Sequence, residues 1–148
     1  MVAAVEIVGD ELLQLIPQRP PMVMIDRFLG VNEAESYARL MVAPDNLFVC
    51  DGYLQESGII EHIAQSAAAR VGYLYRENRE PVPLGFIGSV DKLTVHRLPG
   101  VGQSLYTTIS IIQEVGDITL IGAKVEADAQ LIAECRMKIF LKKEEGKA

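Results

Sequence analysis

Between residues 59 and 75 the apolar side chains recur every three or four positions, which places them on one face of a helix. The series consists of Ile60, Ile63, Ala64, Ala67, Ala68, Val71, Leu74 and Tyr75. The alanines at 64, 67, 68 and 69 are strong helix formers with small side chains, so another layer can approach the helix axis closely. The pattern predicts one long helix packed against a core.

Several other segments have the extended, alternating character of β-strands, and the alternation is clearest over residues 136–141. Extended segments are predicted at 22–28, 36–42, 83–95, 104–114, 117–128 and 130–142. A short opening helix around residues 12–16 is expected to end at Pro17, whose ring removes a backbone donor. One long helix between two early strands and four later ones predicts an α+β fold, with the helix on one face of a curved antiparallel sheet.

Length and composition describe one globular domain over residues 1–148, with 49% hydrophobic and 23% charged residues. The net charge of −6 gives no electrostatic reason to bind nucleic acid. The chain has no apolar run of the ~20 residues needed to span a bilayer, and its first residues do not resemble a secretory signal. These features predict a cytoplasmic protein.

Metal, nucleotide and flavin sites are not expected, because the chain lacks ligand clusters and glycine-rich phosphate loops. Cys50 and Cys135 lie far apart and belong to no CxxC motif, so both are predicted to be free thiols. His62 and His96 are the only histidines, which limits the candidates for any histidine-dependent mechanism.

The pair Glu61 and Gln65 is the main candidate for chemistry. Residues four apart share a helix face, and the small residues Ala68 and Gly72 continue the same line. A carboxyl group and an amide therefore lie beside a nearly bare stripe. Helical spacing alone is equally consistent with a solvated acid in the first turn, stabilised by the helix N-terminus.

Three stretches resemble the 3-hydroxyacyl-acyl-carrier-protein dehydratases, in the same order as in that family. Residues 15–27 (Leu-Ile-Pro-Gln-Arg-Pro-Pro-Met-Val-Met-Ile-Asp-Arg) resemble its opening, Leu-Pro-His-Arg-x-Pro followed by an apolar strand and Asp-Arg. Residues 61–65 (Glu-His-Ile-Ala-Gln) resemble its central-helix Glu-Ala-Met-Ala-Gln. Residues 85–91 followed by 96–100 resemble its later strand and Pro-Gly turn.

The resemblance implies a hotdog fold, in which the long helix is wrapped by the sheet and two subunits form an acyl tunnel. The substrate would be a thioester on acyl carrier protein or coenzyme A, losing water to give a trans-2-enoyl product. Glu61 would protonate the departing hydroxyl beside Gln65, because burial in an apolar tunnel favours the protonated form of a carboxyl group. Substrate contacts would come from Phe48, Tyr53, Gly58, Ala68, Phe86, Ile87 and Gly88.

The loop before the helix departs from the family. Where the family carries Gly-His-Phe-Pro-Gly with its catalytic base, residues 46–58 are shorter and contain no histidine. The chain in this respect resembles the divergent dehydratase-like branch associated with aryl polyene pathways. Asp51, Cys50 and Tyr53 lie in this loop, and Asp51 is the catalytic candidate among them, although each also suits a turn or a packing role.

The two histidines have other expected roles. His62 lies roughly 100° around the helix from Glu61 and is predicted to be a surface or packing residue. His96, with Arg97 and Lys92, is expected to contact an acidic carrier protein.

Three functions remain open from the sequence. The first is an active dehydratase, or its reverse hydratase, that uses Glu61 with a replacement base. The second is a hotdog thioesterase in which Glu61 activates water. The third is a catalytically silent acyl-binding subunit, or one half of a heterodimer with a histidine-bearing homologue; otherwise a homodimer or higher oligomer is expected.

Overall fold

The computed structural model describes residues 3–142, which form two helices and nine strands. In chain order the elements are β1 (Ala3–Ile7), α1 (Gly9–Leu13), β2 (Arg27–Val31), β3 (Glu35–Met41), β4 (Val49–Cys50), β5 (Tyr53–Leu54), α2 (Glu56–Glu77), β6 (Leu84–Val95), β7 (Ser104–Val115), β8 (Ile118–Ala127) and β9 (Gln130–Lys142).

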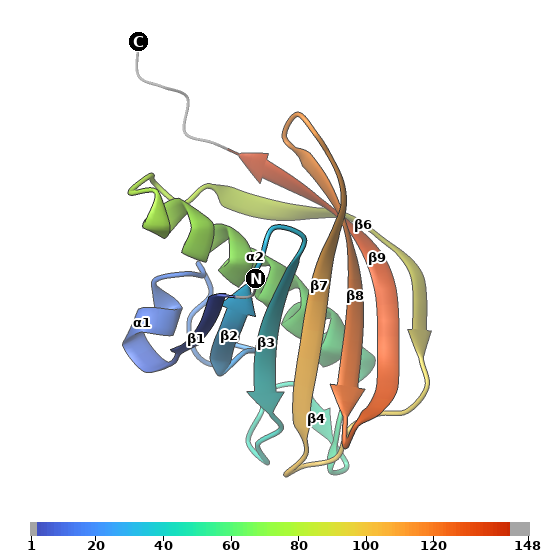
Figure 1. The fold of residues 1–148 in the computed structure, drawn as a ribbon. Helices are drawn as coiled ribbons and strands as arrows, with labels where there is room; N and C mark the ends of the chain where they lie inside the picture. The colour runs from blue at the N-terminus through green and yellow to red at the C-terminus, as the bar shows by residue number, and fades with distance from the viewer. Residues whose placement is uncertain (1–2, 143–148) are drawn as a thin grey trace.

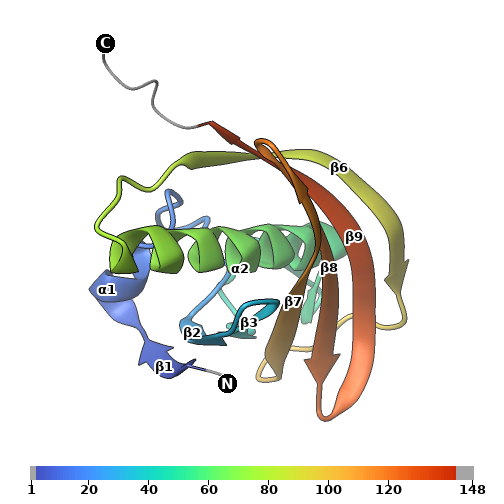
Figure 2. The same ribbon diagram turned by 45° about the horizontal axis from the view of Figure 1, so that its top comes forward.

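Seven strands form one antiparallel sheet in the order β1-β2-β3-β7-β8-β9-β6, and β4 pairs with β5 in a separate small hairpin. The sheet curls around α2, and the beginning of β6 passes over the helix on the side away from β2 and β3 (Figures 1 and 2). This arrangement confirms the predicted α+β hotdog fold, with one long helix wrapped by a curved antiparallel sheet.

The apolar face of α2 forms the main core with the inner face of the sheet. Ile59 and Ile63 are fully buried against strand residues such as Ile121 and Val125. A second cluster lies beneath β1, β2 and α1 and includes Phe28. The alternating exposure of β8 and β9 follows the alternation in their sequence, since successive side chains point to opposite faces.

Gly72 determines how closely the chain segment after α1 approaches the long helix. A side-chain carbon at this position would overlap the carbonyl oxygen of Leu15. Leu15 itself is fully buried, so the two backbones meet in direct contact. The small residues of α2 thus let the neighbouring segment pack close to the helix axis, as their small size predicted. At position 72, where the backbone of residue 15 crosses the helix, only glycine fits.

The structure corrects the prediction for residues 22–28, where a strand begins only at Arg27. The preceding residues instead lie against α2, whose side chains bond the backbone of Met22 and Met24 in place of a neighbouring strand. The sequence pattern also missed β1 and the β4–β5 hairpin, while α2 begins three residues before the predicted start at Ile59.

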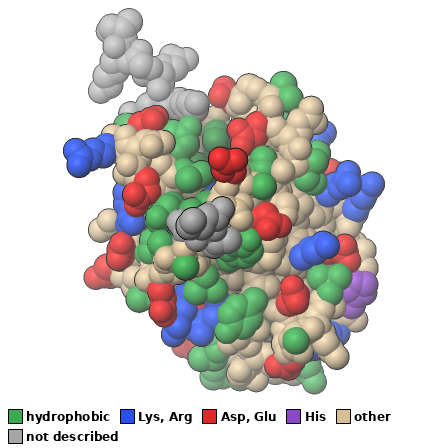
Figure 3. Space-filling model, in the orientation of Figure 1, with side chains coloured by type: hydrophobic (Ala, Val, Ile, Leu, Met, Phe, Trp, Pro, Cys, Tyr) green, Lys and Arg blue, Asp and Glu red, His purple; other side chains and the backbone are tan. Residues whose placement is uncertain are grey.

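The described surface mixes both signs of charge. On the face shown in Figure 3, Asp and Glu side chains are interspersed with Lys and Arg and with apolar residues. Neither described helix combines the length and the apolar character required to cross a membrane.

Candidate functional site

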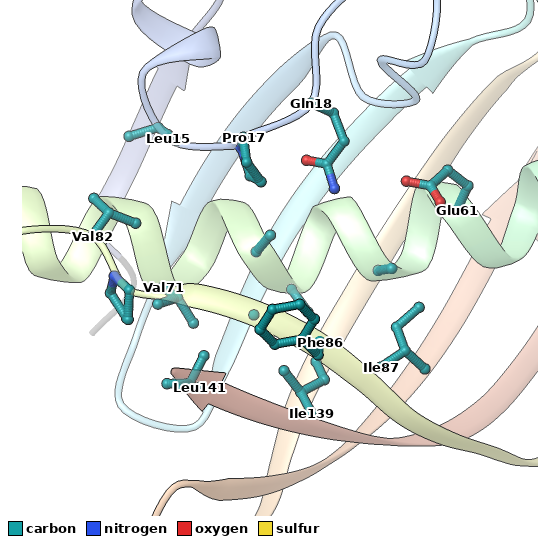
Figure 4. A pocket seen from close by; sticks show the side chains of 15 residues that line it. Leu15, Pro17, Gln18, Glu61, Val71, Val82, Phe86, Ile87, Ile139 and Leu141 are labelled. Atoms are coloured by element: carbon teal, nitrogen blue, oxygen red, sulfur yellow. The ribbon is translucent and has the colours of Figure 1, made fainter. Parts of the chain in front are cut away.

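A mostly apolar pocket of about 260 Å³ lies beside α2, enclosed by residues 15–18, the beginning of β6 and the end of β9 (Figure 4). Ala64, Ala68 and Val71 form its helical wall, and Phe86 forms part of the opposite wall. The polar side chains on the pocket wall are those of Glu61 and Gln18. The pocket therefore suits an extended hydrocarbon chain whose polar group lies beside Glu61 and Gln18.

Glu61 and Gln65 are brought together as their spacing predicted. The Nε2 of Gln65 donates a hydrogen bond of 2.6 Å to Oε2 of Glu61. Glu61 lies partly exposed on the pocket wall, whereas Gln65 is completely buried behind it. Gln65 thus holds the carboxyl group of Glu61 from behind.

The orientation of the Gln65 amide follows from its backbone partners. Its Oε1 accepts a 2.6 Å hydrogen bond from the backbone N–H of Met24, which can only donate. Its Nε2 donates at 2.8 Å to the carbonyl oxygen of Met22, which can only accept. Nε2 therefore faces Glu61 as a donor and occupies Oε2, which leaves Oε1 as the carboxyl oxygen without this hydrogen bond. That oxygen is the one available to a bound molecule.

His62 is a packing residue on another face of α2, as its position on the helix predicted. It is completely buried, with Nδ1 at 2.7 Å from the Met24 carbonyl oxygen and Nε2 at 2.7 Å from the Thr107 hydroxyl. Since the carbonyl oxygen only accepts, Nδ1 donates to it and Nε2 accepts from Thr107. Burial lowers the pKa of His62 to about 4, although the bond to Met24 and the charge of Asp26 oppose this effect.

The structure places three of the predicted substrate-binding residues on the pocket wall: Ala68, Phe86 and Ile87. Gly88 lies beyond the wall, beneath the ring of Phe140, which occupies the space of a side chain there. Its small size serves packing on the neighbouring strand.

The predicted residues of the loop lie away from this pocket within the single chain. Asp51 is exposed at the turn between β4 and β5 with a left-handed φ of 53°. Tyr53 is 52% exposed in the same hairpin. Gly58 packs tightly against Phe48 and Leu54, so a larger residue at 58 would collide with both. The roles of these residues in catalysis and binding stay predictions.

The predicted carrier-binding residues lie toward the end of β6 farther from the pocket. Nε2 of His96 is 3.6 Å from Oε2 of Glu134. Arg97 donates to the Gln103 side chain and to the carbonyl oxygen of Ala127. Lys92 is exposed, with a φ of 54°. Neither histidine of the chain lines the pocket that contains Glu61.

Gln18 is the polar pocket residue that sequence reasoning missed. A signal was present, because Pro17-Gln18-Arg19 matches the Pro-His-Arg of the resembling family's opening with glutamine in place of histidine. Its proximity to the helix acid in space could not be inferred from a separation of 43 positions in the sequence. Within residues 3–142, no group of three or more His, Cys, Asp or Glu side chains could hold a metal ion.

Comparison with known proteins gives a consistent result. Residues 11–147 match the family model described as ApeP-like, ApeP dehydratase. The chain is 25% identical over 138 residues to the 3-hydroxyacyl-[acyl-carrier-protein] dehydratase FabZ of Desulfotalea psychrophila, covering 90% of this chain and 91% of that protein. It is 28% identical over 127 residues to FabZ of Streptococcus sanguinis, covering 84% of this chain and 90% of that protein.

Among solved structures, a chain of the dehydratase heterocomplex ApeI:P from Xenorhabdus doucetiae superimposes with a TM-score of 0.84 at 16% identity, covering 90% of this chain and 91% of that one. An uncharacterised protein, PH1136 from Pyrococcus horikoshii, gives a TM-score of 0.66 at 14% identity, with 88% and 93% of the two chains covered. At these identities the likeness supports the hotdog fold.

Proposed function

This chain belongs to the ApeP-like family of dehydratases, and on that premise we propose that it removes water from a 3-hydroxyacyl thioester carried by acyl carrier protein or coenzyme A. The observation that carries the proposal is the position of Glu61. Its carboxyl group stands on the wall of an otherwise apolar pocket, with one oxygen held by Gln65 and the other available. The FabZ relatives, named for this activity, support the choice of substrate.

In the proposed reaction Glu61 acts as the general acid. A base removes a proton from C2, the electron pair of that C–H bond forms the C2=C3 double bond, and the C3–O bond breaks. The hydroxyl leaves as water with the proton from Oε1 of Glu61. Gln65 positions the acid throughout, because its amide keeps donating to Oε2.

The base is proposed to come from a second subunit. Within this chain, His62 is enclosed between Met24 and Thr107, and His96 lies beside Glu134. Neither faces Glu61. A histidine-bearing homologue would supply the missing group, and the similarity to a protein named as a dehydratase heterocomplex supports such a partner.

The edge strand β6 is the proposed place of pairing. It ends the seven-strand order, so one side of its backbone has no neighbouring strand in the described structure. Leu84, Phe86 and Ile87 of this strand are 46%, 49% and 45% exposed. Because Phe86 and Ile87 also line the pocket, a subunit that covers β6 would remove both apolar surface and the pocket from water.

The loop and carrier contacts also remain proposals. Asp51 and Tyr53 are exposed in the β4–β5 hairpin, where they are available to the pocket of a partner subunit. Lys92, His96 and Arg97 are proposed to meet the acidic carrier protein, since the positive charges of Lys92 and Arg97 favour association with an acidic partner.

Turnover of a 3-hydroxyacyl thioester tests the proposal directly. The chain is assayed alone and together with a histidine-bearing hotdog homologue, and enoyl thioester formation is followed by its absorbance. Glu61→Gln should reduce kcat by about 10²- to 10⁴-fold, the contribution typical of a general acid. Glu77→Gln is the matched control, because that acid lies at the exposed end of the same helix.

Two results would contradict the assignment. A Glu61→Gln variant that keeps the full rate in the active assembly would make this chain a silent subunit whose partner carries the chemistry. Release of free thiol without enoyl product would indicate a thioesterase. A rate that appears only with the partner and disappears with Glu61→Gln supports the composite site.

A further inference from the structure

Met24 has both of its backbone polar groups bonded to side chains of the long helix. Its N–H donates at 2.6 Å to Oε1 of Gln65, and its carbonyl oxygen lies 2.7 Å from Nδ1 of His62. Met24 is 1% exposed, and within residues 3–142 its backbone makes no main-chain hydrogen bond. Two side chains of α2, three positions apart and therefore neighbours on the helix surface, thus take the place of a neighbouring strand.

Both ring nitrogens of His62 are bonded in the core. The imidazole is completely buried, and its Nε2 accepts a 2.7 Å hydrogen bond from the hydroxyl of Thr107 in β7. Since Nδ1 donates to the Met24 carbonyl, the ring ties the segment before β2 to α2. Alanine stands at this position in the motif that residues 61–65 resemble, and an alanine side chain makes neither contact. The bond to Met24 therefore depends on the histidine of this chain.

The orientation of the Gln65 amide depends on the same segment. Oε1 of Gln65 faces a donor, the N–H of Met24, and Nε2 faces an acceptor, the Met22 carbonyl oxygen at 2.8 Å. The second N–H of Gln65 is left to donate to Oε2 of Glu61 at 2.6 Å. Any displacement of residues 22–24 from α2 removes the partners that distinguish the two ends of the amide.

An inverted amide would change the chemistry at Glu61. It would turn the carbonyl oxygen of Gln65 toward the carboxyl group, and a carbonyl oxygen can only accept hydrogen bonds. That oxygen would take the hydrogen bond of a protonated Glu61 and compete with the substrate's hydroxyl for the acidic proton. The donor orientation of Gln65 therefore keeps the proton of the acid available to the substrate.

We propose that His62 is a positioning residue for the reaction at Glu61. It holds the Met24 carbonyl and thereby the segment that orients the Gln65 amide. This inference rests on the proposed function of the Glu61 pocket. His62 does not line that pocket, so its effect passes through Met24 and Gln65. Without the Nδ1 donor the buried Met24 carbonyl is left unpaired, and the cost of that state favours displacement of the segment toward water.

Two substitutions separate this role from simple packing. The amide of asparagine lies at the same distance from the main chain as Nδ1 of histidine, and the amide of glutamine at that of Nε2. His62→Asn therefore keeps a donor for Met24, whereas His62→Gln keeps a partner only for Thr107. Packing alone predicts that His62→Gln is the milder change, because glutamine is closer to histidine in volume. Positioning predicts the opposite order.

Steady-state kinetics of the active assembly give the first test. His62→Gln should lower kcat by about 10- to 100-fold with little change in KM, because small misplacements of reacting groups have effects of this size. His62→Asn should restore most of the lost rate. Thr107→Val is the matched control, because it removes the other hydrogen bond of the same ring; it should lower stability but keep kcat.

Side-chain NMR gives a second test that needs no substrate. The Nε2 protons of Gln65, whose signal is identified by its absence in Gln65→Met, should exchange slowly with water in the wild-type chain. In His62→Gln their exchange should be about tenfold faster, the equivalent of one lost hydrogen bond. In His62→Asn and Thr107→Val it should stay near the wild-type rate.

Three results would overturn the inference. The first is a full kcat, or an unchanged exchange rate of the Gln65 amide, in His62→Gln. The second is a Thr107→Val variant that loses as much rate as the inference assigns to His62→Gln. That result indicates a general weakening of the core and decides against positioning even if the His62 variants do not fold. The third is a His62→Asn variant slower than His62→Gln, the order that packing predicts.

The proposed function and this inference fail separately. If no assembly turns over the thioester but the Gln65 exchange rates follow the expected order, the function fails while His62 still orients the amide. If turnover depends on Glu61 but not on a donor at position 62, the function stands and the inference is wrong.

Discussion

Acidification should destabilise this protein through His62, which is held neutral in the core. The imidazole is fully buried, donates to the Met24 carbonyl and accepts from the Thr107 hydroxyl. Protonation would place a second donor against the hydroxyl and a charge in an apolar interior. Burial accordingly lowers the pKa of His62 from 6.5 to about 4 in the folded chain.

The sign and size of the effect follow from proton linkage. Between pH 6.5 and 4 the unfolded chain binds a proton at this residue and the folded chain does not, so stability falls as the pH falls. The difference between the two pKa values corresponds to about 3 kcal/mol, which is lost mostly across that window. That loss is large beside the ~5–15 kcal/mol that stabilise ordinary domains.

Urea unfolding followed by circular dichroism at pH 7, 6, 5 and 4, at constant protein concentration, measures this loss. His62→Gln removes the titrating group, so the variant should be less stable at pH 7 but lose about 3 kcal/mol less than the wild type on acidification. His96→Gln is the control, because that histidine is 48% exposed in its side chain. The reasoning is refuted if the stability difference between wild type and His62→Gln stays constant over this pH range.

Three further predictions concern packing, a turn and the two thiols. Gly72→Ala should lower the free energy of unfolding by about 1–3 kcal/mol, because the new carbon overlaps a backbone oxygen, whereas Gly85→Ala, with its nearest contact at 3.6 Å, should change it little. Arg70→Met should cost about 1–3 kcal/mol in the same urea assay, since its guanidinium donates to the carbonyl oxygens of Glu33, in the β2–β3 turn, and Glu35, at the start of β3. A thiol reagent at pH 8 should modify only the exposed Cys50 in the native chain, and Cys135 only after denaturant is added. Cys135 is protected because it is 5% exposed and burial raises its pKa to about 11. Rapid reaction of both thiols in the native chain would contradict this packing.

Local pattern was sufficient for the elements whose stability comes from one buried face. The period of the apolar residues located α2, and alternation located β6 to β9 within a few residues. The contact between Glu61 and Gln65 also followed from spacing, since four residues make one turn of helix. The strand predicted at 22–28 failed because side chains of α2, about 40 positions later, satisfy its backbone in place of a strand.

The sequence by itself determined the layers of this protein, its long helix and the acid on that helix, because neighbouring residues and their periodicity decide which face of an element is buried. Only the tertiary structure decided what surrounds the acid. Gln18, Phe86 and Glu61 line one pocket because the Leu15 backbone packs on Gly72 and because β6 passes over α2. Contacts of this kind depend on how segments far apart in the chain pack together, and no local sequence pattern specifies that packing.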